Sequence, residues 1–585
     1  MCGIFAVINK NKENLNLDKC RKALNLLNKR GPDWKVEKKI DKHIYLGQSI
    51  LSMTGKMKKD LNNNFSISKN FFLLFVGEIY NYRNLNSDYL QNLNLNSTSD
   101  TNVFANLFER FPKNKVNNLL DGMYAYLLYD KSENILTIGR DPNGEKTLYI
   151  FEDNLKIIIS SEIGPILFYN KKINLNINIL KNYYLTRHFL NLEKTIFNGI
   201  RKIETGIQMD LNFLNFKFKI KDRIKINNYI NPVIYNKNLK RKEDDIINEL
   251  DDLINKNIKQ MIPEKRKYAS IVSGGIDSSL VSSYLCSNSN PNYLIYLNHV
   301  GKDFHTAKIK SFEKYLKRRI HIHDVNEKNY FNTYLKAINI CKTPINSHSF
   351  VGQYLNANIV SKKNCRALFG GEGADELFGG YSTYLPNNSN LNLNNSDYTK
   401  IVDSNLFKET KEQTLFKKQM HSKWKECLSN YSFVSNTSER QSLSMMLMDA
   451  TLQMESNAFR GSDLMSMNNS VESRSLFFRK EIVNFALNLP FKFKINSSSS
   501  PDMKTKFILK KLFIKKFSKK LILKKQGFAG FPNEMVKYVG PIDKFILNNY
   551  VDNVKLKDNF YKDRGIQWKI LNTELYLKMI NPKHL

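Results

Sequence analysis

A serine- and glycine-rich segment near the middle of the chain has residues that could hold a polyphosphate. Ser273-Gly274-Gly275 follows the apolar run Tyr268 to Val272 and precedes a helical pattern, Ser278 to Cys286. Glycines let the backbone approach a ligand closely, and the N–H groups of a helix N-terminus favour anions. The segment lacks the Gly-Lys-Ser/Thr ending of a Walker loop. It predicts a phosphate-binding turn, with a chance turn as the alternative.

A second segment, Gly370 to Tyr381, places three carboxylates, those of Glu372, Asp375 and Glu376, among five glycines. Glycine weakens helix and strand interiors, so this composition is expected where the backbone passes close to a ligand. Carboxylate oxygens are the ligands that Mg²⁺ prefers. The alternative is an acidic surface loop.

The thiol of Cys2 stands directly after Met1. Methionine before a small residue is commonly removed, which would give Cys2 a free α-amino group, and thiol and amine on one residue supply a nucleophile and its base. The alternative is a buried structural cysteine. The six cysteines are widely scattered, without a Cys-x-x-Cys pair or metal-ligand spacing with the nine histidines, so we expect no zinc site or disulfide framework.

In order and separation, the two glycine-rich segments resemble the synthetase domain of glutamine-hydrolysing asparagine synthetases. Ser273 to Ser278 has the Ser-Gly-Gly-x-Asp-Ser pattern of ATP pyrophosphatases, which cleave ATP between the α and β phosphates and transfer AMP. The resemblance implies ATP and Mg²⁺ as cofactors and Glu372 as the base that takes a proton from ammonia or its adduct. It also implies that Lys506 neutralises departing pyrophosphate, with Lys504 as the alternative. The implied ATP-binding residues are Ser273, Gly274, Gly275, Asp277, Ser278 and Gly371, and the implied metal ligands are Asp277 and Asp375.

The N-terminal half resembles the glutaminase domain of the same family. The matching segments, in family order, are Met1 to Phe5, Arg30-Gly31-Pro32-Asp33, Gly77-Glu78-Ile79-Tyr80-Asn81 and Ser99-Asp100. The resemblance implies that Cys2 attacks the amide of glutamine. Gly77, Glu78 and Asp100 are implied as oxyanion and glutamine-binding residues, with the Gly77 N–H on the oxyanion and Asp100 on the α-amino group.

Two departures concern this glutaminase half. Val76 stands where the family has an asparagine whose amide completes the oxyanion hole, and losing such a donor can cost about 10²-fold to 10³-fold in rate. Ile50 stands where the family has an arginine for the α-carboxylate of glutamine, and an apolar side chain cannot replace that ion pair. We favour a retained but altered glutaminase, because Cys2, Gly77 and Asp100 persist; the alternative is an enzyme that uses free ammonia.

The acceptor-side segments also differ from the family pattern. Leu464 stands where the family often has arginine, and Leu476-Phe477-Phe478-Arg479 replaces a Pro-Phe-Leu-Asp ending. Aspartate is the default acceptor, and another carboxylate, such as a sugar acid or a secondary-metabolite precursor, is the main alternative. A cyclising synthetase that needs no ammonia is disfavoured by Cys2 and Glu372. The chain segment Lys525 to Phe528 resembles a further family segment.

The positioning elements are expected to form two domains. Residues 1–209 contain short β-rich runs, such as Phe71 to Val76 and Tyr124 to Tyr129; residues 210–240 form a predicted linker; residues 241–585 contain a strand-helix-strand pattern that indicates a parallel sheet. The resemblance implies an αββα N-terminal-nucleophile sandwich of the Ntn-hydrolase class, followed by a helix-rich α/β adenine-nucleotide domain with a PP-loop.

Composition limits the other function classes. The formal charge of +35 would suit a nucleic-acid partner, but Lys, Asn and Ile are abundant throughout and no usual nucleic-acid-binding motif is present. We therefore expect small-molecule substrates and no nucleic acid, and a non-catalytic binding protein is the least favoured alternative. Without a long apolar run or a secretory signal, we expect no membrane segment and a cytoplasmic location, and a homodimer stays open.

Overall fold

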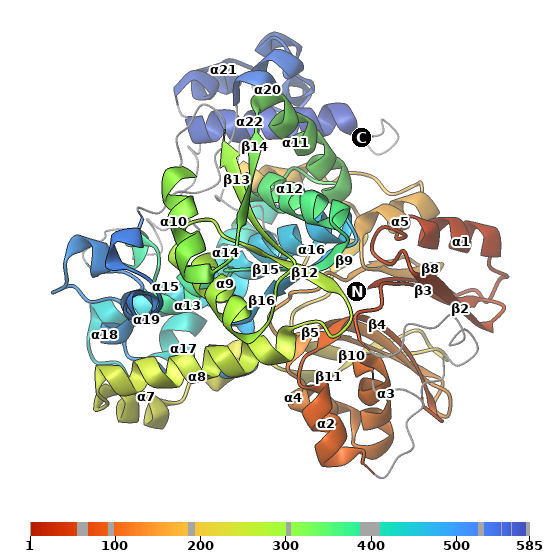
Figure 1. The fold of residues 1–585 in the computed structure, drawn as a ribbon. Coiled ribbons are helices and arrows are strands. Elements are labelled where there is room, and N and C mark those ends of the chain that lie inside the picture. Colours follow the sequence, from red (N-terminus) through yellow and green to blue (C-terminus); the bar gives the residue numbers. More distant parts are fainter. Residues whose placement is uncertain are drawn as a thin grey trace.

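The structure is a computed structural model that describes residues 2–54, 68–91, 99–184, 193–299, 306–386, 410–523, 532–551, 553–562 and 564–580. The segment Lys525 to Phe528 lies outside these residues. The N-terminal half lies to the right in Figure 1, and the last helices of the chain lie at the top. Among the described residues, no helix combines the length and apolar character that a membrane span requires.

Six antiparallel strands form the first sheet of the N-terminal half, in the order β2-β3-β1-β8-β7-β9. They are β1 (Cys2–Asn9), β2 (Trp34–Asp41), β3 (Ile44–Ile50), β7 (Tyr149–Glu152), β8 (Lys156–Ser160) and β9 (Ile200–Lys202). Because side chains alternate along a strand, Phe5 and Val7 of β1 pack with the helices α1 (Leu17–Asn25) and α5 (Ile163–Tyr169), whereas Ile4 and Ala6 face the second sheet.

The second sheet has the order β11-β10-β6-β5-β4. Its strands are β4 (Phe71–Ile79), β5 (Gly122–Asp130), β6 (Ile135–Arg140), β10 (Ile207–Asn212) and β11 (Phe218–Arg223). Leu74 and Val76 face the first sheet, and Leu73 and Phe75 pack under the helices α2 (Tyr82–Tyr89), α3 (Asp100–Arg110) and α4 (Lys113–Leu119). Two sheets between two helical layers confirm the predicted αββα sandwich.

A five-stranded parallel sheet organises the C-terminal half, in the order β14-β13-β12-β15-β16. Its strands are β12 (Lys267–Ile271), β13 (Tyr293–His299), β14 (Ile320–Val325), β15 (Cys365–Gly370) and β16 (Glu472–Ser475). One face packs on α8 (Glu243–Met261), α9 (Ile276–Asn288) and α10 (Thr306–Leu316), and the other on α12 (Ser349–Lys362). The predicted parallel α/β sheet is confirmed.

Helices surround this sheet and make the half mainly helical, as expected. The remaining α-helices are α6 (Ile177–Lys181), α7 (Pro232–Leu239), α11 (Glu327–Cys341), α13 (Ala374–Phe378), α14 (Lys411–Asn430), α15 (Thr437–Met448), α16 (Arg460–Met467), α17 (Lys480–Leu487), α18 (Phe491–Lys494), α19 (Phe507–Lys516), α20 (Pro532–Val539), α21 (Asn553–Lys562) and α22 (Arg564–Met579). A π-helix, Asp449–Phe459, joins α15 directly to α16. Such helices are rare and occur most often at functional positions.

The boundary between the halves is a packed interface. The segment 210–240, predicted as a linker, contains the end of β10, the paired strand β11 and the helix α7. Leu51, Met53, Tyr80 and Met123 of the N-terminal half belong to the same hydrophobic cluster as the residues under the parallel sheet. The two halves therefore share a core.

Candidate functional site

The first glycine-rich segment forms a tight turn between β12 and α9. The Ser273 N–H donates to the Ser278 Oγ at 3.1 Å, the two hydroxyl oxygens lie 2.8 Å apart, and the Gly275 N–H donates to the Ser273 Oγ at 3.3 Å. Gly274 has a φ of +80°, a conformation that glycine adopts at little cost. The turn thus brings hydroxyls and the N-terminus of α9 to one place, as an anion site requires.

The second segment, after β15, lies directly against this turn. A Cβ at Gly371 would stand 2.6 Å from the Asp277 Cβ and 2.7 Å from the Ser278 nitrogen. Only glycine allows the two backbones to approach this closely. The predicted ATP-binding and metal-binding segments are therefore neighbours in space, although about 100 residues separate them in the chain.

Lys506 joins the two segments electrostatically. Its Nζ contacts the carboxylate of Asp277 and lies 2.7 Å from the Asp375 Oδ1. Burial opposes the charge of Lys506, but the two carboxylates outweigh it and raise the pKa of the ammonium. The lysine thus occupies the point where the two carboxylates converge.

The same pair of carboxylates fits magnesium. Asp277 and Asp375 both reach one Nζ, so their hard oxygen atoms can share one cation. No group of three or more His, Cys, Asp or Glu side chains forms a metal site in the described part of the chain. Two carboxylates completed by substrate phosphates are the usual protein environment of Mg²⁺.

Glu372 stands at the edge of this cluster. Its carboxylate folds back over Gly370, and its buried Oε2 has no hydrogen-bond partner among the described residues. Burial raises the pKa of Glu372, and the charge of Asp277 raises it further. A carboxylate with a raised pKa and a spare oxygen can accept a proton from a reacting amine.

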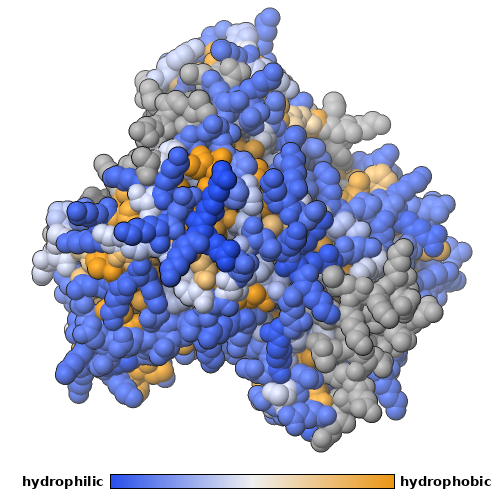
Figure 2. All heavy atoms as spheres, viewed as in Figure 1, coloured by the Kyte–Doolittle hydropathy of each residue, from blue (hydrophilic) through white to orange (hydrophobic). Residues whose placement is uncertain are grey.

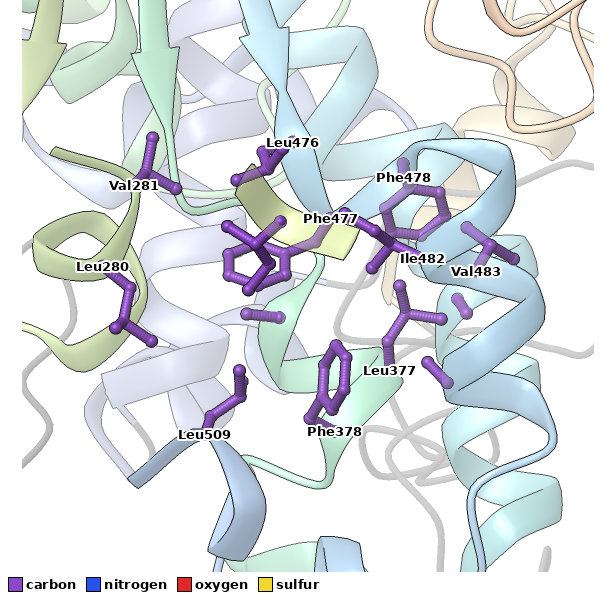
Figure 3. Close-up of a cluster of buried hydrophobic side chains, with 14 of the residues drawn as sticks. Leu280, Val281, Leu377, Phe378, Leu476, Phe477, Phe478, Ile482, Val483 and Leu509 are labelled. Carbon is purple, nitrogen blue, oxygen red and sulfur yellow. The ribbon is translucent and has the colours of Figure 1, made fainter. Parts of the chain in front are cut away.

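An apolar layer packs against the two glycine-rich segments. Figure 3 shows Leu280 and Val281 of α9, Leu377 and Phe378 of α13, Leu476 to Phe478, Ile482 and Val483 of α17, and Leu509 of α19 in one cluster. Gly373, with a φ of +90°, lies against the ring of Phe478, which a Cβ would approach to 2.2 Å. Packing therefore fixes the backbone beside Glu372.

Cys2 begins the central strand of the first sheet. It pairs with Ile50 of β3, and its carbonyl oxygen accepts a hydrogen bond from the Arg30 Nε at 3.1 Å. Burial raises the pKa of the Cys2 thiol, the N-terminal charge and the hydrogen bonds from Gln48 and Leu51 oppose this, and Asp100 adds to the rise. The joint role of Cys2 and Asp100 in one glutamine site stays a prediction.

The predicted oxyanion segment lies at the end of β4. Gly77 has a φ of +135°, and a Cβ there would stand 1.9 Å from the Met123 carbonyl oxygen, so the position needs glycine. Asp100 accepts hydrogen bonds from the Thr54 hydroxyl at 2.6 Å and from the Ile79 N–H at 3.2 Å. Asp100 is thereby tied to the segment that contains Gly77.

Two residues in the apolar cluster around Cys2, Val76 and Ile50, depart from the family pattern, and Glu78, which matches it, is paired elsewhere. Val76 is fully buried between the two sheets, and Ile50 packs against the same apolar cluster. Neither side chain can donate a hydrogen bond or pair with a carboxylate. Glu78, predicted to bind glutamine, directs its buried carboxylate to Arg474 of β16. Direct contact of Glu78 with glutamine stays a prediction.

Buried ion pairs join the two halves beside the thiol site. Arg30 donates to both oxygens of Asp463 at 2.9 Å and pairs with Glu162 at 3.2 Å. Lys146 pairs with the same Asp463 at 3.2 Å. Asp463, the neighbour of Leu464 in the acceptor-side segment, therefore forms ion pairs at the interface next to Cys2.

Sequence reasoning missed these contacts, and also one lysine. Arg30 stands inside a segment that resembles the family, but nothing local in the sequence gives the partners of Arg30 and Arg474, which lie far along the chain. Lys510 follows Lys506 by one turn of α19; it is nearly buried and donates to the Thr505 hydroxyl at 3.2 Å. Burial and the charge of Lys506 lower the pKa of Lys510 to about 8. Its four-residue spacing from Lys506 was the available signal.

Comparison with known proteins agrees with both halves. Residues 1–219 match the family of glutamine amidotransferase domains, and residues 249–569 match the asparagine synthase family. A glutamine-hydrolysing asparagine synthetase of Bacillus subtilis is 24% identical over 87% of this chain and 84% of its own length. A second such synthetase of that bacterium is 24% identical over 66% of this chain and 53% of its own length.

A relative that is not named as an asparagine synthetase also matches. The microcin J25-processing protein of Escherichia coli is 26% identical over 32% of this chain and 33% of its own length. The family thus includes proteins named for a reaction other than asparagine formation. The domain matches, the αββα sandwich and the parallel sheet agree, and this chain belongs to the asparagine synthase family, with a glutamine amidotransferase domain at its N-terminus.

Proposed function

We propose that the protein is an ATP-dependent ligase that converts aspartate into asparagine through an acyl-adenylate. The observation that carries this proposal is the convergence of Asp277 and Asp375 on Lys506, beside the spare carboxylate oxygen of Glu372. Similarity to the two asparagine synthetases of Bacillus subtilis supports aspartate as the acceptor.

The chain's own residues suggest how the steps divide. The turn from Ser273 to Ser278 holds the phosphates of ATP, and Mg²⁺ held by Asp277 and Asp375 would neutralise their charge. The acceptor carboxylate attacks the α phosphorus, and pyrophosphate leaves towards Lys506. Ammonia then attacks the acyl carbon, Glu372 takes a proton, and AMP leaves as the amide forms.

Glutamine is the proposed nitrogen source, with Cys2 as the nucleophile. A second candidate is an enzyme that depends on free ammonia. The apolar side chains of Val76 and Ile50 beside the thiol favour this second candidate, because they supply neither an oxyanion donor nor a cation. We therefore expect slow glutamine hydrolysis, roughly 10²-fold or more below a complete site.

Another acceptor is a weaker candidate than the sequence indicates. Arg479, the charged departure in the acceptor-side segment, is fully buried and pairs with Glu145 at 2.6 Å and Asp121 at 3.4 Å. Leu476, Phe477 and Phe478 are buried in the apolar layer. Contacts in the core and at the interface therefore account for these departures, and no different substrate is needed to explain them.

Pyrophosphate release tests the proposal. Purified protein is given ATP, magnesium and aspartate, with either ammonia or glutamine, and products are identified by mass. Asparagine and AMP from both nitrogen donors support the full proposal, and asparagine from ammonia alone supports the second candidate. Cys2→Ala should abolish glutamine use and leave ammonia use. No turnover with aspartate, together with turnover on another carboxylate, would overturn aspartate as the acceptor.

A further inference from the structure

A hollow of about 790 Å³ lies at the edge strand of the parallel sheet, and none of its lining residues belongs to the groups assigned to either reaction. It is formed by the end of α10, the turn after it, the edge strand β14 and the first residue of β13. We call this hollow the basic pocket. Its lining residues are Tyr293, Lys310, Glu313, Lys317, Arg318, Arg319, Ile320, His321, Ile322 and His323. The volume lies within the range of small-molecule sites.

The charged side chains that line the basic pocket are mostly positive. Four lining residues, Lys310, Lys317, Arg318 and Arg319, are exposed cations, and Glu313 is the one acidic side chain among the described lining residues. Glu313 is already engaged, because it accepts a hydrogen bond from the Ile320 N–H at 2.7 Å. The carboxylate therefore caps the strand and leaves the cations to face solvent.

A rigid ring platform forms part of the wall. The rings of Tyr293 and His321 stack with centroids 4.0 Å apart, and the Tyr293 hydroxyl lies 2.9 Å from the His323 Nε2. The ammonium of Lys363 lies 5.9 Å from the centre of the Tyr293 ring and adds a further cation beside the pocket. Partial burial lowers the pKa of His321, and Arg319 and Lys363 lower it further. Arg319 and Lys363 therefore both add positive charge beside the His321 ring.

Convergence separates this pocket from the general basicity of the chain. Exposed lysines elsewhere, such as Lys35, Lys38 and Lys39 on β2, lie along one strand of the first sheet. In the basic pocket, cations from α10 and from the turn after it line one hollow, and Lys363 at the end of α12 lies beside its Tyr293 ring (Figure 2 shows hydrophilic residues over α10). Two adjacent arginines can hold phosphate oxygens in a forked geometry that lysine lacks.

We propose that the basic pocket is a second phosphate-binding site, which takes a short chain of phosphate groups. Two small molecules share that chemistry, a free nucleoside triphosphate and inorganic triphosphate. The stacked rings of Tyr293 and His321 would add affinity for the nucleoside. The site is independent of the proposed amidation, because its cations lie outside the groups assigned to that reaction.

Calorimetric titration of the full chain with a non-hydrolysable ATP analogue tests the proposal. The pocket variant is Lys310→Gln/Arg318→Gln/Arg319→Gln, and the matched control, which removes the same charge, is Lys35→Gln/Lys38→Gln/Lys39→Gln. We expect two binding events in the wild type and in the control. The pocket variant should lose one event or weaken it at least tenfold, and Lys506→Met should lose the other.

Further titrations identify the ligand of the basic pocket, and an amidation assay tests the proposed function separately. Inorganic triphosphate with equal affinity assigns the site to phosphates alone, and tenfold tighter binding of the ATP analogue assigns it to a nucleotide. Unchanged binding in the pocket variant, or an equal loss in the control, would refute the proposal that the basic pocket binds phosphate groups. A single-stranded RNA that binds the wild type a hundredfold more tightly than both would replace the proposal with an RNA surface. Amidation by the pocket variant, measured separately, should equal that of the wild type.

Discussion

At the scale of single residues, the ammonium of Lys506 occupies the position between two carboxylates where a metal cation could bind. Lys506 neutralises Asp277 and Asp375, so the two carboxylates can lie close together before any metal arrives. Two adjacent carboxylates without a cation would repel each other and raise one pKa.

Replacing Lys506 and Lys504 one at a time shows which of the two lysines acts on pyrophosphate. We expect Lys506→Met to lower pyrophosphate release at least 100-fold, because the leaving group loses its charge partner. Lys504→Met is the matched control and should keep activity within threefold. Steady-state pyrophosphate assays with ammonia as donor measure both. Equal losses in the two variants would contradict the assignment of Lys506.

Lys510 predicts a pH dependence of ATP binding. Its pKa of about 8 means that the side chain loses its charge as the pH rises through 8, so an anion should bind less tightly above that pH. We expect the KM for ATP to rise several-fold between pH 7.5 and roughly 9 in the wild type. Lys510→Arg stays charged over this range, and its KM should remain flat. A parallel rise in both proteins would assign the effect elsewhere.

At the scale of elements, the two glycine-rich segments can lie against each other because glycine has no side chain where their backbones meet. The turns and the parallel sheet could be predicted, since β-rich runs, a strand-helix-strand order and turn residues are local signals. The residue that each glycine contacts could not be predicted. That Gly371 faces Asp277, and Gly373 faces Phe478, depends on contacts about 100 residues away in the chain.

Gly373 is the sharpest test of this geometry. Gly373→Ala would put a Cβ 2.2 Å from the Phe478 ring at a φ of +90°, so both a clash and backbone strain of about 1–2 kcal/mol are expected. Gly540→Ala is the control, because it has a φ of +77° and no atom within 4 Å. Thermal unfolding should show a larger loss for Gly373→Ala, accompanied by loss of ammonia-dependent amidation. Equal shifts in both variants would mean that only backbone strain matters.

At the scale of the whole molecule, charged groups are buried where the halves meet and inside the synthetase half. Sequence could predict two domains and their folds but not the closeness of their contact. Arg30 with Asp463 and Arg474 with Glu78 are long-range pairs that no local pattern encodes. For the same reason the segment 210–240 resembled a linker: its polar composition hides the pairing of β11 with β10.

The burial of Lys494 predicts how the stability of the whole protein changes with pH. Burial lowers its pKa to about 7, far below the unfolded value near 10.4, so the folded state binds its proton less tightly. Stability should therefore rise with pH between about 7 and 10, by at most about 1.4 kcal/mol per unit from this group. Lys494→Met keeps the apolar stem and should stabilise the protein most at or below pH 7. Urea unfolding across this range measures the difference, and a pH-independent difference would refute the burial of an uncompensated amine.

The shared hydrophobic cluster limits how this gene can be rearranged. Leu51, Met53, Tyr80 and Met123 are core residues of one half that complete the interior of the other. A gene-fission event that made two separate polypeptides would expose those apolar patches on both products. Chimeras with a foreign glutaminase half would need matching shapes at the same positions. We therefore expect a foreign half to be accepted only when its residues at these four positions fill the same shared core.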